Sequence, residues 1–370
     1  MEENYIISGI QQVGVGCENF EAAWKWYIEM FQMNVRILED DTVAAQMLPY
    51  TGGVPQKRHA CIAVNLQGGG GFEIWQYSER TPQPCSFDVE AGDLGINCAK
   101  LRTRNAEAFR KEIYGKIASG AHTPRKKRNS PKVSEVYTTP DGKKGFTVLD
   151  PWGNYFQVIE DEYVFIEQHT LGGGIAGATT GCTDIDRTLP LYRDLLGYDT
   201  VIYDKTDVFE DMKFMKGGEG RFRRVLLGHP NPRRGAFAPL FGSSTIELIQ
   251  ALDRQPRKIY EGRFWGDPGF IQICFDVTNM RELEKRCNAL GFPFTVDSCQ
   301  DDGHFDMGEA SGHFTYIEDP DGTLLELVEA HKLTIMKRPH IFINMLKRNR
   351  EKAFPKFFFR LMGMSKVKFE

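Results

Sequence analysis

The first eighty residues alternate apolar and polar positions in a way that predicts a strand, then a helix, then three strands. Residues 8–18 alternate with the period of two that a half-buried strand shows. Residues 19–33 repeat apolar positions with the spacing of an amphipathic helix, and further alternating runs end at residues 71–77. This order of elements, written βαβββ, is the unit of the predicted fold.

The same order returns three more times along the chain. The later copies begin with strand-like runs at residues 93–101, 173–184 and 270–279, and an amphipathic segment follows each of them. Such repetition predicts four modules, with boundaries near residues 80, 165 and 265. Because one module cannot close a curled sheet alone, we expect the modules to pair.

Two of the modules close in hairpins that carry the same turn residues. The sequence Asp-Pro-x-Gly occupies residues 150–153 and again residues 319–322. Proline presets φ at the first central position of a turn, and glycine supplies a positive φ at its end. The two turns therefore support the repeat, because each follows an alternating strand and a helix.

The βαβββ order, with these turns near the end of the unit, resembles the vicinal oxygen chelate superfamily. That group includes glyoxalase I, extradiol dioxygenases, 4-hydroxyphenylpyruvate dioxygenase and bleomycin-resistance proteins. The resemblance covers about residues 8–331 and implies an α+β fold, with four βαβββ modules forming two curled mixed sheets in a tandem glyoxalase-like arrangement. We expect two domains of two modules each, residues 1–165 and 166–332, followed by a tail at residues 333–370.

Composition changes this picture little. The 370 residues carry a net charge of −4, which gives no reason to expect nucleic acid as a partner. The eight cysteines are scattered without CxxC pairs, which is typical of free thiols in a reducing cytosol. The N-terminal residues resemble neither a signal peptide nor a membrane span. We therefore expect a cytoplasmic protein.

The C-terminal tail differs from the rest of the chain in charge. Residues 332–370 hold eleven Lys or Arg against Glu351 and Glu370, so they carry about +9. Apolar residues interleave with these charges, which predicts two short amphipathic helices broken near Pro355. The apolar face would dock on the domains or in a homodimer, or the tail would make a peripheral contact with an anionic membrane.

In the superfamily, inward-facing residues on the first and last strands of two paired modules hold a metal ion. The resemblance therefore implies eight candidate positions. They are Gln12 and Glu73 in the first module, Gly95 and Gln157 in the second, Gly177 and Glu247 in the third, and Gln272 and Glu326 in the fourth.

The pairing of modules decides which of these residues meet. If neighbours pair, as in extradiol dioxygenases, each site includes one glycine and lacks one ligand. If the first module pairs with the fourth, as in fused two-copy glyoxalases, the side chains of Gln12, Glu73, Gln272 and Glu326 converge. The other four positions then form an empty pseudo-site. We favour the second arrangement.

The residue types limit the chemistry of such a site. Two carboxylates and two amide oxygens suit Mg²⁺, Mn²⁺ or Ca²⁺, while glyoxalase-like relatives use Zn²⁺ or Ni²⁺. We therefore expect a divalent metal ion, with Zn, Ni, Mn and Mg as the candidates. No His stands at any of the eight positions, which argues against the 2-His-1-carboxylate iron site of oxygenases.

The leading hypothesis is a metal-dependent lyase or isomerase resembling glyoxalase I, with a small-molecule substrate that carries vicinal oxygens. Glu73 and Glu326 would be metal ligands and catalytic proton-transfer groups, and Gln12 and Gln272 would be neutral ligands. The alternatives are a metal-free small-molecule binding protein, as in the bleomycin-resistance group, and an atypical dioxygenase.

Three further residues are candidates for substrate binding. His59 begins a strand of the first module, and His313 begins the closing hairpin of the fourth. Trp75 shares the face of Glu73 by the period of two along a strand. We expect these three side chains to face the site that the first and fourth modules form.

Overall fold

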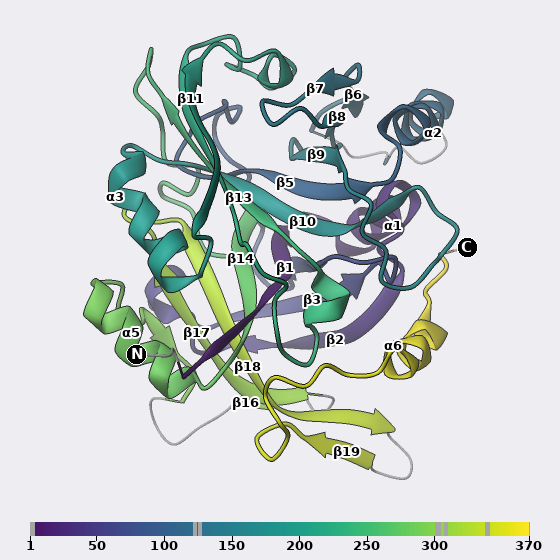
Figure 1. Cartoon of the computed structure of the whole chain (residues 1–370), viewed down its shortest axis with the longest axis vertical. Helices are drawn as coiled ribbons and strands as arrows, with labels where there is room; N and C mark the ends of the chain where they lie inside the picture. The colour runs from purple at the N-terminus through teal and green to yellow at the C-terminus, as the bar shows by residue number, and fades with distance from the viewer. Residues whose placement is uncertain are drawn as a thin grey trace.

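The computed structural model describes residues 4–120, 124, 128–299, 305–306, 310–336 and 341–369. These residues form two curled mixed sheets with helices on their outer sides (Figure 1). The structure thus confirms the α+β fold that the sequence predicts.

The four predicted modules are present. The first contains β1 (Ile6–Gly16), α1 (Phe20–Phe31), β2 (Val35–Ala44), β3 (Gln56–Val64) and β4 (Gly71–Tyr77). The second contains β5 (Gly95–Thr103), α2 (Ala106–Ser119), β6 (Lys132–Val133), β7 (Tyr137–Thr138), β8 (Lys144–Leu149) and β9 (Tyr155–Glu160).

The third and fourth modules repeat the order with short additions. The third contains β10 (Gly172–Gly181), α3 (Ile185–Pro190), β11 (Thr200–Asp207), β12 (Phe222–Gly228), α4 (Ala238–Phe241) and β13 (Thr245–Ala251). The fourth contains β14 (Gly269–Thr278), α5 (Met280–Leu290), β15 (Val296–Asp297), β16 (Phe305–Asp306), β17 (Ala310–Glu318) and β18 (Leu324–Met336).

The sheets join the first module to the fourth and the second to the third. Sheet A has the strand order β15-β17-β18-β14-β1-β4-β3-β2, and sheet B has the order β11-β12-β13-β10-β5-β9-β8-β6. The central strands β1 and β14 pair antiparallel in sheet A, as β5 and β10 do in sheet B. The favoured pairing is therefore present, and each sheet combines a module from residues 1–165 with one from residues 166–332.

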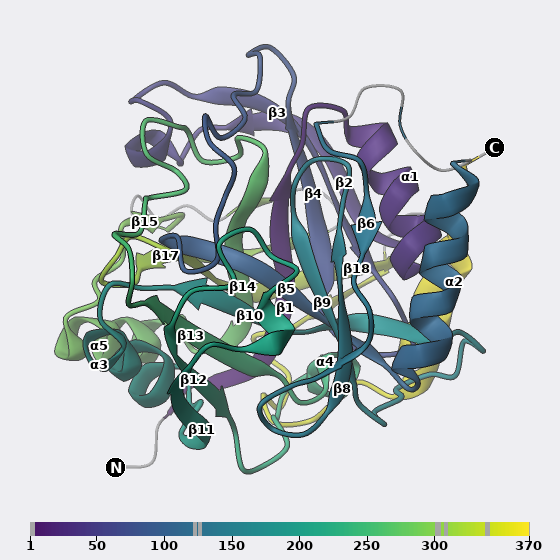
Figure 2. The ribbon, with the colours of Figure 1, turned by 90° about the horizontal axis from the view of Figure 1, so that it is seen from above.

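Helices cover the two sides of the molecule in pairs. Figure 2 shows α1 and α2 together on one side, with α3 and α5 on the opposite side. Lys116 Nζ of α2 donates to the carbonyl oxygen of Glu29 in α1 at 2.8 Å. Asn19 and Asn105 accept hydrogen bonds from the first turns of α1 and α2 and so fix where these helices begin.

The Asp-Pro-x-Gly segments form the predicted turns. Asp150 Oδ1 accepts hydrogen bonds at 2.8 Å from the backbone N–H groups of Trp152 and Asn154, and Gly153 has a φ of 99°. The Tyr27 hydroxyl donates to Asp150 Oδ2 at 2.8 Å, so this turn also anchors α1 of the first module. This turn of the second module thus contacts a helix of the first module.

The tail docks on the rest of the chain, with one change from the predicted secondary structure. Its described residues form β19 (Ile341–Asn344), which pairs with β18, and α6 (Lys356–Met362). The prediction of two helices is therefore right for α6 and wrong for residues 341–344, because the long strand β18 offers an edge with which they pair. No helix among the described residues has both the length and the apolar character that a bilayer span requires.

Candidate functional site

A cavity of about 740 Å³ lies against the concave face of sheet A. Successive side chains of a strand point to opposite faces, so alternate residues of β3 line the cavity, namely Arg58, Ala60, Ile62 and Val64. Its size lies within the range typical of small-molecule sites, roughly 300–1,000 Å³. The curled sheet therefore holds a pocket large enough for a ligand.

Segments outside the first and fourth modules complete the wall of this cavity. They are α4, through Phe237, Leu240 and Phe241, and the tail helix α6, through Phe358, Leu361 and Met362. All six side chains are apolar. The cavity therefore combines apolar side chains from these two segments with polar groups from the sheet.

Two glutamates lie at the polar end of the cavity and share one amide group. Glu73 is on β4 and Glu326 is on β18, and both line the cavity. Gln272 Nε2, on β14 between them, lies 2.7 Å from Glu73 Oε2 and 3.3 Å from Glu326 Oε2. The structure thus brings together three of the four predicted ligands, although they are far apart in sequence.

The fourth predicted ligand lines the same cavity. Gln12 is buried on β1, and its Oε1 atom, like Oε1 of Gln272, has no hydrogen-bond partner among the described residues. The Gln272 side chain occupies the space above Gly14, where an added Cβ would lie 2.6 Å from Gln272 Oε1. A side chain at this position would therefore displace the Gln272 amide from its place beside the glutamates.

The electrostatics of the glutamate pair are unfavourable without a cation. Burial raises the pKa of Glu73, and the nearby Arg58 and the hydrogen bond from Gln272 only partly offset this effect. Burial and the charge of Glu73 raise the pKa of Glu326 as well. Among the described residues, no Lys or Arg forms an ion pair with either glutamate, since Arg58 pairs with Asp40 at 2.7 Å.

These residues fit a divalent metal ion. Two carboxylates and two buried amide oxygens without donors form a set of hard oxygen ligands, which Mg²⁺, Mn²⁺ and Ca²⁺ prefer. Gln272 presents its N–H group to the carboxylates, and a half-turn of the amide would present its oxygen instead.

In sheet B the corresponding glutamate, Glu247, forms ion pairs with two cationic side chains of the chain. Glu247 Oε2 lies 2.7 Å from Lys100 Nζ, and Glu247 Oε1 lies 2.7 Å from Arg224 Nε. Burial alone would raise the pKa of Glu247, but Arg224 and Lys100 lower it well below its usual range. The pocket beside these side chains is only about 80 Å³. The predicted pseudo-site is therefore filled by a protein ion-pair network.

The strand register corrects one position of this pseudo-site. In three modules the residue that pairs with the glutamate lies two places after the first-strand position predicted for the site. Gly14 pairs with Glu73, Thr179 pairs with Glu247, and Cys274 pairs with Glu326. In the second module Lys100 pairs with Gln157, so the counterpart of Gln12 is Cys98 rather than the predicted Gly95. The prediction of Gly95 is wrong because the sequence pattern alone gives no register for β5.

The structure does not bring His59 and His313 to the cavity. Alternation places His59 on the face opposite Arg58 and Ala60, where it packs on Phe20 at 4.2 Å and lies 3.1 Å from Glu39. His313 likewise precedes Phe314, which lines the cavity, and it pairs with Asp297 at 2.6 Å.

Trp75 shares the face of Glu73 but does not line the cavity. It is fully buried, and its ring packs edge-on against Trp265 with 4.8 Å between centroids. Trp265 itself lines the cavity, together with Tyr316, which pairs across the strands with Glu326. Trp75 therefore supports the wall from behind.

Sequence reasoning missed several cavity residues. Tyr316 could have been found because it lies directly across the hairpin from Glu326. Arg58 could have been found because the period of two along β3 places it on the same face as Ile62, which lies across from Glu73. No local pattern identifies Trp265, α4 or α6, since they reach the cavity from other parts of the chain.

Comparison with known proteins bears on the fold. No family model matches the sequence, and no curated protein matches it. A glyoxalase I mutant from Zea mays matches with a TM-score of 0.52 and 12% identity, over 87% of this chain and 93% of that chain. A proposed dioxygenase from Bacillus subtilis subsp. subtilis str. 168 matches with a TM-score of 0.54 and 12% identity, over 99% and 98% of the two chains. With its four βαβββ modules, the chain therefore has the fold of the vicinal oxygen chelate superfamily.

Proposed function

We propose that this chain is a metal-dependent lyase or isomerase of the vicinal oxygen chelate type. One observation carries the proposal: Glu326 is buried and Glu73 half-buried around a single amide, and no Lys or Arg of the described residues forms an ion pair with either carboxylate. Burying two carboxylates in this way is costly unless a cation compensates them. A bound divalent ion would supply that charge and polarise the neighbouring oxygens of a substrate.

The residues of the chain divide the remaining work. Gln12 and Gln272 would bind through their amide oxygens, which leaves the site neutral when both glutamates are ionised. A carboxylate oxygen of Glu73 or Glu326, both of which line the cavity, would take a proton from the carbon next to a carbonyl and return it to the adjacent carbon, while a proton passes from one substrate oxygen to the other. The net result is an isomerisation in which no atom is lost.

The cavity wall indicates the kind of substrate. Most of the lining beyond the glutamates is apolar and comes from α4, α6 and the strands of sheet A. Arg58 also lines the cavity, and its guanidinium offers further hydrogen-bond donors to an oxygen or a carboxylate. We propose a substrate with two vicinal oxygens attached to a sizeable apolar or aromatic group.

Proton exchange tests this function directly. Protein loaded with Mn²⁺, Ni²⁺ or Zn²⁺ is incubated in D₂O with 2-hydroxyketones and 2-hydroxyaldehydes that carry apolar groups, and NMR follows exchange next to the carbonyl. We expect exchange in the wild type and a rate lower by about 100-fold or more in Glu73→Gln and Glu326→Gln. The exposed Glu79→Gln serves as the matched control in the first module and should exchange like the wild type.

Two other outcomes would replace this proposal. Consumption of O₂ by the metal-loaded protein with a catechol would favour the dioxygenase alternative. Binding of apolar ligands without metal or exchange, unchanged in Glu326→Gln, would favour the metal-free binding protein, for which the apolar cavity is the supporting observation.

A further inference from the structure

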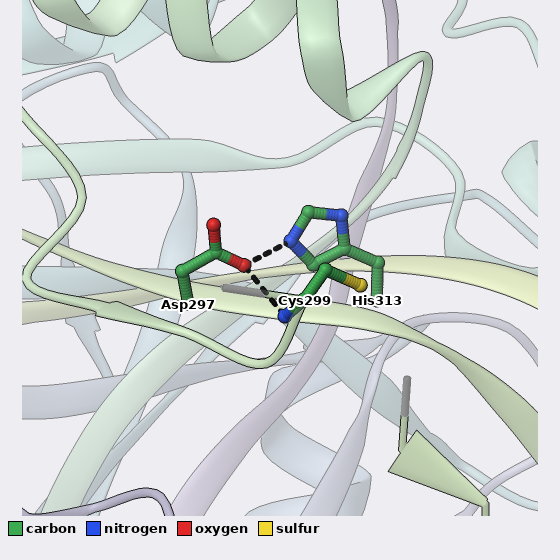
Figure 3. A group of neighbouring side chains, drawn as sticks. All are labelled: Asp297, Cys299 and His313. Atoms are coloured by element: carbon green, nitrogen blue, oxygen red, sulfur yellow. Dashed lines mark hydrogen bonds and ion pairs between the residues drawn. The ribbon is translucent and has the colours of Figure 1, made fainter. Parts of the chain in front are cut away.

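A second group of side chains with metal-ligand chemistry lies at the free edge of sheet A. Asp297 on β15, Cys299 just after it and His313 on β17 place their donor atoms within 4.8 Å of one another (Figure 3). β15 is the last strand in the order of sheet A, and it pairs with β17. Its donor atoms differ from those of the glutamate site, because it offers sulfur and nitrogen as well as oxygen.

Neighbouring contacts orient these side chains. The backbone N–H of Cys299 donates to Asp297 Oδ1 at 2.8 Å, and His313 Nε2 lies 2.6 Å from the same oxygen. The side chains of Asp297 and His313 are 17% and 13% exposed, so the group is sheltered but reachable. These contacts hold the three side chains close together.

Cys299 differs from the other cysteines of the chain. The remaining seven are buried, whereas Cys299 is partly exposed. A reachable thiol beside an imidazole and a carboxylate is a donor set that suits Zn²⁺. Glu329 lies across the strands from His313 but is not part of this group. Its carboxylate accepts hydrogen bonds from the backbone N–H groups of Asn279 and Met280 at the start of α5.

We infer that Asp297, Cys299 and His313 bind one Zn²⁺ ion, with water in the fourth position. Ligand atoms of a tetrahedral zinc site lie about 2.0–2.3 Å from the ion and about 3.5 Å from one another, so donor atoms within 4.8 Å of one another need only side-chain adjustments. His313 Nε2 and Asp297 Oδ1, now 2.6 Å apart, would separate, or Asp297 would bind through Oδ2. The thiol loses its proton to solvent when the ion binds. The ion would fasten β15 to β17 beside the loop at Gln46, whose side chain donates to the carbonyl oxygen of Ser298 at 3.2 Å and which lines the cavity.

Cobalt substitution tests this site independently of the glutamate site. Co²⁺ bound through a thiolate has a charge-transfer absorption in the near ultraviolet, and an all-oxygen site does not produce it. We expect one such ion per chain in the wild type and in Glu326→Gln, and no charge-transfer band in Cys299→Ser. His313→Gln should weaken Co²⁺ binding by about tenfold or more.

In the Glu326→Gln background, zinc should also raise the melting temperature, and the further substitution Cys299→Ser should abolish this rise, with the two metal-free proteins melting alike. The absence of the band from the wild type, or its survival in Cys299→Ser, would overturn the assignment. Failure of proton exchange at the glutamate site would leave the band unaffected, so the two proposals fail separately.

Discussion

In sheet B, the Nζ atom of Lys100 lies 2.7 Å from Oε2 of Glu247. By strand register the corresponding positions of sheet A hold Gly14 and Cys274, which carry no charge. The positions that match Arg224 hold Ala60 and Phe314. Sheet B thus neutralises its glutamate with cations of the chain, whereas the two glutamates of sheet A form no ion pair with a Lys or Arg of the described residues.

The first prediction concerns Glu247. Replacing it with Gln leaves Lys100 and Arg224 buried with less compensating charge, so Glu247→Gln should lower the free energy of unfolding by about 3–5 kcal/mol. Urea unfolding at neutral pH measures the change. The double variant Glu247→Gln with Lys100→Met should recover part of the loss; equal stability of the single variant and the wild type would contradict the network.

The second prediction is that Glu326→Gln, unlike Glu247→Gln, stabilises the metal-free protein. Glu326→Gln removes one of two mutually repelling buried carboxylates, so it should raise the unfolding free energy of the metal-free protein by about 1–3 kcal/mol. The same variant should lose the stabilisation that added Mn²⁺ gives the wild type. Thermal melts with and without Mn²⁺ measure both effects, and destabilisation of the metal-free variant would count against the account.

The third prediction concerns pH. Burial raises the pKa of Asp276 from about 3.8 to about 7. Between about pH 4 and pH 7 the folded chain keeps a proton that the unfolded chain has lost, so this group makes stability fall as pH rises through that window. Asp276→Asn should therefore raise the free energy of unfolding by about 2–3 kcal/mol more at pH 8 than at pH 5, because about two units of the shift lie between pH 5 and pH 7, and thermal melts at the two pH values measure the difference. The exposed Asp41→Asn is the control, and an equal effect at both pH values would refute the prediction.

The fourth prediction concerns the tail. Phe359 of α6 is fully buried and packs on Phe165 at 4.9 Å, whereas Phe357 of the same helix is 67% exposed. Phe359→Ala should lower the free energy of unfolding by about 3–5 kcal/mol and open the cavity to an apolar dye. Phe357→Ala should stay within about 0.5 kcal/mol of the wild type.

Contact of the tail with an anionic membrane and its role in a homodimer stay predictions. Phe357 and Met364 expose apolar surface among basic residues, a combination that suits an anionic membrane. Co-sedimentation with anionic liposomes, comparing the intact chain with one that ends at residue 336, tests this contact, and equal pelleting would exclude it. The homodimer needs a separate measurement of mass in solution.

The sequence was sufficient for the modules because their signals are local. Alternation, helical spacing and the Asp-Pro-x-Gly turns depend on neighbouring residues and predicted the modules, whereas the sheet arrangement and the glutamate pair were implied by the resemblance to the vicinal oxygen chelate superfamily. The register of β5, which replaces Gly95 by Cys98, depends on pairing across the sheet and could not be predicted from such signals. The position of His313 beside Asp297 depends on the same kind of pairing between β15 and β17.

Binding of Mn²⁺ is the most direct test of the central claim that Glu73 and Glu326 hold a divalent ion. Isothermal titration of the metal-free wild type, Glu73→Gln, Glu326→Gln and Cys299→Ser separates the glutamate site from the cysteine group, because Mn²⁺ prefers oxygen ligands. The account predicts one Mn²⁺ per chain in the wild type and in Cys299→Ser, and loss of that binding in both glutamate variants. Absence of Mn²⁺ binding by the wild type, or the same binding by Glu326→Gln, would contradict it.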